Sequence, residues 1–253
     1  MRHLDAAALA ALLPPADLIE ALRAGFRSGC TLPVRHHHTI PRSGEPDALL
    51  LLMPAWTDGG CLGVKISTVF PGNGARGLGA VQGSYVLSSA KTGVAMASMD
   101  GLELTLRRTA AASALAASYL AREDAARLLV VGTGNLAPHL ARAHAAVRGV
   151  ARVGVWGRDP AKAAAVAARL RSEGFDACAE PDLEAAARAA DVISCATLSE
   201  QPLIRGAWLR PGTHLDLVGA FTPRMRESDD EAVRRAEVFV DTREGAESEA
   251  GDL

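Results

Sequence analysis

Aromatic residues are scarce in this chain, and neither sign of charge dominates it. Only 4% of the 253 residues are Phe, Trp or Tyr, too few for the stacking surfaces on which single-stranded nucleic acids bind. Lysine and arginine number 27 against 29 aspartates and glutamates, so no basic excess attracts a phosphate backbone. We therefore expect no nucleic-acid partner, and any phosphate site must be local.

The chain also lacks the cysteine spacing and the long apolar runs of other protein classes. Its four cysteines are far apart and form no Cys-x-x-Cys pair, which argues against a zinc site or a disulfide framework. The three histidines at 36–38 alternate sides on a strand and cannot converge on one ion. The charge-free stretch at 109–121 is shorter than the ~20 residues of a membrane span, and the N-terminus lacks a secretory signal. We expect a cytoplasmic protein with no metal and no membrane contact.

The composition is otherwise typical of a protein with a folded core, and the spacing of the apolar residues changes along the chain. Residues 4–27 show helical spacing, whereas residues 33–99 form short apolar runs separated by turns, which predicts a largely antiparallel sheet. A long helix follows at 103–123, and beyond it strands and helices alternate, which predicts a parallel sheet. We predict an α/β protein with an α+β domain at 1–124 and a Rossmann-type, doubly wound domain at 125–241.

The strongest local signal is an apolar strand at 128–131 that runs into Gly-x-Gly-x-x-Ala and an alanine-rich helix. In a dinucleotide-binding turn Gly132 permits the bend, Gly134 leaves room for the pyrophosphate, and Ala137 packs the helix on the strand. A merely structural glycine turn is the alternative. The residues expected to bind the cofactor here are Gly132, Thr133, Gly134, Asn135, Leu136 and Ala137.

The end of the second strand bears on the choice of cofactor. Where NAD-binding proteins carry an acidic residue, this sequence has Arg158 followed by Asp159. Arg158 can pair with a 2′-phosphate, which favours NADPH, with NADH as the alternative. Arg158 as a solvated turn residue and Asp159 as a helix cap before Pro160 is the competing interpretation. Thr197, after a later strand, is expected near the nicotinamide, or is a plain loop threonine.

Several segments together resemble the ornithine cyclodeaminase/mu-crystallin family, and the resemblance covers essentially the whole chain. They are residues 63–66, 104–111, 132–134, 218–223 and 225–227. The Arg-Thr-Ala-Ala sequence at 108–111 is the most specific of them. The resemblance implies a homodimer whose N-terminal part binds substrate and forms the dimer. Family activities include ornithine cyclodeamination, amino-acid dehydrogenation and the reduction of cyclic ketimines.

Members of the family hold the substrate carboxylate with cationic residues that match Arg35, Lys65 and Arg108. The chemistry is reasonable, because an arginine offers a bidentate fork and a lysine offers a point charge that can also donate a proton. For Arg35 a surface arginine beside a strand is the alternative.

One departure from the family pattern concerns Phe221, which stands where ornithine cyclodeaminases carry an acidic residue after Gly-Ala. Phenylalanine neither accepts a proton nor binds an ammonium group, whereas an apolar wall suits a ring without a free amine. This variant resembles members that reduce Δ1-pyrroline-2-carboxylate and Δ1-piperideine-2-carboxylate to L-proline and L-pipecolate with NAD(P)H. The alternatives are an amino-acid dehydrogenase, an ornithine cyclodeaminase-type enzyme, and a non-catalytic, crystallin-like protein that binds NADPH.

The resemblance also bears on the last residues of the chain. Relatives continue for some tens of residues that return to the N-terminal domain. Residues 242–253 are therefore expected to be the start of that segment, and the segment is expected to be truncated here.

Overall fold

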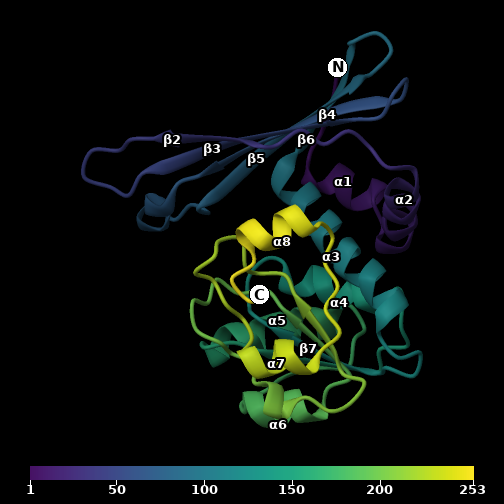
Figure 1. Cartoon of the computed structure of the whole chain (residues 1–253), viewed down its shortest axis with the longest axis vertical. Coiled ribbons are helices and arrows are strands. Elements are labelled where there is room, and N and C mark those ends of the chain that lie inside the picture. The colour runs from purple at the N-terminus through teal and green to yellow at the C-terminus, as the bar shows by residue number, and fades with distance from the viewer. The chain divides into compact units, whose positions relative to one another are not determined.

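The computed structural model describes all 253 residues and divides into two compact units, Met1–Arg108 and Thr109–Leu253. Each unit is built on a sheet of its own (Figure 1). The division falls inside helix α3 (Gly101–Leu120). The domain boundary predicted from the sequence, near residue 124, lies just beyond the end of that helix.

The N-terminal unit contains a six-stranded sheet with the strand order β1-β6-β5-β4-β3-β2. Its elements are β1 (Arg2–Leu4), α1 (Ala6–Leu12), α2 (Pro15–Ser28), β2 (His36–Ile40), β3 (Ala48–Trp56), β4 (Cys61–Val69), the 3-10 helix η1 (Pro71–Arg76), β5 (Val81–Ser89) and β6 (Ala95–Asp100). All neighbouring strands pair antiparallel except β1 and β6, which are parallel. The predicted antiparallel sheet is thus confirmed.

Local sequence signals explain where the first helices begin. The side chain of Asp5 caps α1 by accepting a hydrogen bond from the amide of Ala8 at 2.8 Å. Pro15 is the first residue of α2, a position at which the missing N–H costs no hydrogen bond. Each helix buries one aliphatic side chain almost completely, Leu9 in α1 and Ile19 in α2.

The C-terminal unit contains a five-stranded parallel sheet with the order β11-β10-β7-β8-β9. Its elements after α3 are β7 (Arg127–Val131), α4 (Ala137–Ala145), β8 (Arg152–Trp156), α5 (Pro160–Ser172), β9 (Ala177–Ala179), α6 (Leu183–Ala189), β10 (Val192–Cys195), the 3-10 helix η2 (Gly206–Trp208), β11 (His214–Leu217), α7 (Asp230–Arg235) and α8 (Arg243–Glu249). From β7 the chain winds first toward one edge of the sheet and then toward the other, which is the doubly wound arrangement. The predicted fold class is confirmed.

The core of the C-terminal unit is aliphatic, as the shortage of aromatic residues requires. On one face of the sheet Val130, Val153 and Val155 are at most 1% exposed, and each such side chain contributes about 1.5–3 kcal/mol through burial. On the other face a buried cluster joins Leu129, Ile193 and their neighbours to helix α6. None of the helices combines the length and apolar character that crossing a membrane requires.

Candidate active site

Lys65 lies in the middle of β4, in a row of side chains that crosses the N-terminal sheet. It pairs with Met53 on β3 and with Tyr85 on β5. His36 pairs with Leu52, so the preceding residue, Arg35, stands opposite Met53. Side chains at paired positions share one face of a sheet. The register therefore brings Arg35 and Lys65 to the same face, with Met53 of β3 between them.

Arg108, at the end of the N-terminal unit, adds a third positive charge to this group. The pKa of Lys65 is lowered from 10.5 to about 8, mainly because burial strips water from the ammonium group and further because Arg108 and Arg35 are both nearby cations. The neighbouring Arg107 is engaged elsewhere, by the carboxylate of Glu103 at 2.6 Å and the carbonyl of Leu13 at 3.0 Å. We call Arg35, Lys65 and Arg108 the cationic cluster.

Tyr85 belongs to the same row, and the sequence interpretation did not identify it. Its ring lies against Gly63, where any side chain would overlap the phenol. Burial raises the pKa of the Tyr85 hydroxyl, which therefore stays protonated at neutral pH. No pattern in the local sequence marks Tyr85 as a site residue. Only the pairing of β4 with β5 places it beside Lys65 and against Gly63.

The glycine-rich turn of the C-terminal unit has the backbone that a dinucleotide requires. Gly132 has a φ of 127°, and its amide donates to the carbonyl of Trp156 at 2.8 Å. A side chain on Gly132 would meet the carbonyl oxygen of Ala196 at 2.6 Å. At Gly134, by contrast, the place of a side chain is open, with no atom within 4 Å. This opening, directly before the N-terminus of α4, fits the close approach of a pyrophosphate to the backbone.

The segment after β8 confirms one of the predicted roles. The carboxylate of Asp159 accepts hydrogen bonds from the amides of Ala161 and Lys162, at 2.9 and 3.4 Å, and so caps α5. Arg158, one residue earlier, is exposed. Gly157 makes room for the turn before it, because a side chain there would meet Thr133 Cγ2 at 2.5 Å. Both side chains are exposed at this corner, but the carboxylate of Asp159 is committed to the cap, whereas Arg158 has no such role.

A buried carboxylate ties together the loops that follow β10 and β11. Glu227 is 0% exposed. Its Oε1 accepts hydrogen bonds from the amide and hydroxyl of Thr197, at 2.6 and 2.7 Å, and its Oε2 accepts from the amide of Gly219 at 2.8 Å. Burial raises the pKa of Glu227 more than these three donors lower it. The hydroxyl of Thr197 is thus held by protein rather than turned outward.

Asp252 supports this arrangement from near the end of the chain. Its Oδ1 accepts from the amides of Glu227 and Ser228, at 2.9 and 2.7 Å, and from the Ser228 hydroxyl at 3.0 Å. The sequence interpretation gave neither Glu227 nor Asp252 a role, since a single acidic residue in a loop has no spacing that reveals a clamp. Phe221, two residues after Gly219, is 54% exposed.

The N-terminal unit provides a cationic cluster, and the C-terminal unit provides a dinucleotide-type turn. These are features of a dehydrogenase or reductase that acts on a small carboxylate. Residues 8–253 match the model of the ornithine cyclodeaminase/mu-crystallin family, and the chain belongs to that family.

Individual relatives narrow the comparison. The chain is 42% identical to the Δ1-pyrroline-2-carboxylate reductase of Paracoccus denitrificans, over 94% of this chain and 74% of that protein. The structure of Thermococcus litoralis Δ1-pyrroline-2-carboxylate reductase in complex with NADH and L-proline superposes with a TM-score of 0.92, at 30% identity, over 100% of this chain and 79% of that one. An archaeal alanine dehydrogenase dimer with bound NAD gives a TM-score of 0.88 at 28% identity, over 98% and 77%.

Proposed function

We propose that this chain is an NAD(P)H-dependent reductase of cyclic ketimines. Its substrates are Δ1-pyrroline-2-carboxylate and Δ1-piperideine-2-carboxylate, and its products are L-proline and L-pipecolate. The observation that carries the proposal is the cationic cluster, which supplies binding for one carboxylate without an acidic partner for a side-chain amine. The reductases of Paracoccus denitrificans and Thermococcus litoralis support the same assignment.

In this mechanism the cationic cluster holds the substrate carboxylate. Arg35 and Arg108 offer guanidinium forks, which bind a carboxylate with charge-assisted hydrogen bonds. Lys65, with a pKa of about 8, keeps its proton at neutral pH and is acidic enough to pass it to the ring nitrogen. The imine thus gains one proton from the protein side and one hydride on its carbon, which together give the secondary amine.

Gly132, Thr133, Gly134, Asn135, Leu136 and Ala137 would hold the cofactor pyrophosphate, and the nicotinamide supplies the hydride when it is bound. Glu227 acts through the backbone, because it fixes the loops that carry Thr197 and Phe221. Phe221 would present an apolar surface toward the ring of the substrate.

We assign NADPH as the preferred cofactor and NADH as the weaker one. The support is the exposed guanidinium of Arg158 at the corner where a 2′-phosphate would lie, together with the commitment of Asp159 to the helix cap. A free acidic residue at this corner would bond the ribose hydroxyl and repel a phosphate. NADH remains in the proposal because the two neighbouring structures contain NADH and NAD.

We also assign a homodimer, built through the N-terminal sheet. Leu49 on β3 and Val81 on β5 are exposed apolar residues that both pair with Val69 on β4, so they lie on one face of this sheet. Such residues on adjoining strands are typical of a surface that a second subunit covers. The archaeal alanine dehydrogenase is a dimer.

The same neighbour supports a second candidate, an amino-acid dehydrogenase that runs in the oxidative direction. Initial rates, measured by the absorbance of NAD(P)H, distinguish the two functions. A reductase should oxidise NADPH with either cyclic imine much faster than it reduces NADP⁺ with L-proline, L-pipecolate or L-alanine near neutral pH. Faster turnover in the oxidative direction with a linear amino acid would replace the proposal with the dehydrogenase. Tight NADPH binding with no turnover in either direction would replace it with a binding protein.

A further inference from the structure

The C-terminal sheet carries charged residues on a face that parallel sheets usually fill with aliphatic side chains. In the register of β7, β8 and β9, Arg127 pairs with Arg152, and Leu129 pairs with Gly154, which in turn pairs with Cys178. The side chains at these positions therefore share one face. It is the face that α6 covers, since Leu129 belongs to the same buried cluster as the residues of that helix.

A hollow of about 240 Å³ lies on this face, between the strands and α6. Two features of the sequence leave room on this face: Gly154 has no side chain in the middle of β8, so that Glu180 extends over it, and α6 presents alanines at 185, 186 and 189. Arg127 and Arg152, the first residues of their strands, stand at one side, and Glu180 at the other. The hollow thus has an apolar floor, and charged side chains of both signs surround it.

The polar groups of the hollow are ordered by contacts. Arg152 Nη2 lies 3.2 Å from Cys178 Sγ, and that sulfur lies 3.1 Å from Glu180 Oε1. Glu180 is positioned over β8, because a side chain at Gly154 would meet its Cγ at 2.9 Å. A carboxylate and a guanidinium are therefore held on the same face without forming a direct salt bridge.

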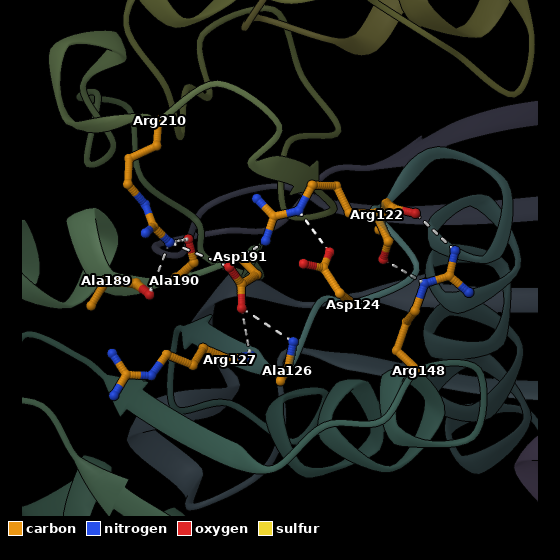
Figure 2. A network of polar contacts seen from close by, with 10 residues as sticks. Arg122, Asp124, Ala126, Arg127, Arg148, Ala189, Ala190, Asp191 and Arg210 are labelled. Atoms are coloured by element: carbon orange, nitrogen blue, oxygen red, sulfur yellow. Dashed lines mark hydrogen bonds and ion pairs between the residues drawn. The ribbon is translucent and has the colours of Figure 1, made fainter.

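The amino end of β7, which carries Arg127, is fixed by Asp191, the residue before β10. Its Oδ2 accepts from the amides of Ala126 and Arg127, at 3.1 and 3.0 Å, and its Oδ1 pairs with Arg122 at 2.9 Å and with Arg210 at 3.3 Å (Figure 2). Burial raises the pKa of Asp191, but these hydrogen bonds and the Arg122 charge outweigh it and leave the pKa lowered. Figure 2 shows the guanidinium of Arg127 extending away from this network. Only the backbone of Arg127 is used there, so its side chain is available to a ligand.

We propose that this hollow is a binding site for a small aliphatic α-amino acid in its zwitterionic form. Arg127 and Arg152 would bind the carboxylate, Glu180 would bind the ammonium group, and the alanines of α6 would contact the aliphatic side chain. Pockets for drug-sized ligands measure about 300–1,000 Å³, so a hollow of this size suits a smaller molecule. It lies at the amino ends of β7 and β8, whereas the dinucleotide turn follows the carboxyl end of β7, so both can be filled together.

The test is calorimetric titration of the full chain with L-leucine, which is not a product of the proposed reaction. We expect L-leucine to bind saturably, and its binding to weaken at least tenfold in Arg127→Gln. The matched control is Arg169→Gln, an exposed arginine on α5, which should leave the affinity unchanged. The leucine analogues 4-methylpentanoate, which lacks the ammonium group, and 3-methylbutylamine, which lacks the carboxylate, should each bind at least tenfold more weakly than L-leucine.

A second variant tests the cavity rather than its charge. Ala185→Leu places a good helix former in the hollow, and we expect it to abolish amino-acid binding while the melting temperature and NADPH binding stay close to wild type. No saturable binding of L-leucine, or L-leucine binding that survives both Arg127→Gln and Ala185→Leu, would overturn the proposal. The titration measures binding without turnover, so a negative result does not affect the ketimine reductase assignment. If that assignment fails, the titration still tests the hollow.

Discussion

The pKa of Lys65 gives the sharpest prediction about the cationic cluster. With a pKa of about 8, about 90% of Lys65 is protonated at pH 7 and about 10% at pH 9. If the ammonium form binds the carboxylate and donates the proton, kcat/KM should be level below pH 7. Above pH 8 it should fall about tenfold for each further pH unit.

Arg108→Gln is the perturbation that tests where this pKa comes from. The substitution removes one of the two cations that lower the pKa of Lys65, so the inflection should move to higher pH. The level part of the profile should also drop, by about ten- to a hundredfold, because a charge-assisted hydrogen bond to the substrate carboxylate contributes ~1.5–3 kcal/mol. The two effects have opposite consequences above pH 9, where the difference in kcat/KM between mutant and wild type should become smaller.

The control for this experiment is Lys65→Arg. A cyclic imine also ionises, so an inflection in kcat/KM can belong to the free substrate. A guanidinium stays charged throughout the accessible range and cannot donate its proton. Lys65→Arg should therefore have a lower kcat/KM, and its residual activity should show no inflection if the inflection belongs to Lys65. An inflection that persists in Lys65→Arg, or one that Arg108→Gln leaves in place or moves to lower pH, would refute the reasoning.

Three further predictions concern the other residues of the site. Arg158→Asp should lower the ratio of kcat/KM for NADPH over NADH at least about tenfold, through lost attraction and new repulsion, and an unchanged ratio would make Arg158 a turn residue only. Glu227→Gln should lower the free energy of unfolding in urea by about 1–3 kcal/mol, because the amide nitrogen replaces one of the two acceptor oxygens and leaves the N–H of either Thr197 or Gly219 without an acceptor; equal midpoints would contradict the clamp. Phe221→Asp alone should release no ammonia from L-ornithine, since one carboxylate does not build an ammonium pocket, and ammonia detected with glutamate dehydrogenase would contradict this.

Local patterns in the sequence were sufficient for much of the fold. The strand at 128–131 followed by Gly-x-Gly-x-x-Ala identifies the start of the doubly wound sheet, because strand, turn and helix are contiguous there. Alternating short apolar runs likewise identify the antiparallel sheet. Asp159 before Pro160 predicts a capped helix from neighbouring residues alone, and the structure shows both hydrogen bonds of that cap.

The parts of the site that depend on strand register were beyond the sequence pattern. Lys65 and Tyr85 are twenty residues apart, and their proximity follows only from the pairing of β4 with β5. The same holds for Arg127 and Arg152 on the α6 face of the other sheet. Glu227 stands in a loop, where hydrophobic periodicity gives no information. Its partners become evident only when the ends of β10 and β11 are seen together.

The most direct test of the central claim follows the hydride itself. The chain is incubated with Δ1-pyrroline-2-carboxylate or Δ1-piperideine-2-carboxylate and NADPH carrying deuterium on one face of C4, with each face labelled in turn. One of the two labelled cofactors should give L-proline or L-pipecolate with a single deuterium on the α-carbon, measured by mass spectrometry after chiral separation. Product without deuterium from both cofactors, or no amino acid from either imine, would contradict the assignment of this chain as a ketimine reductase.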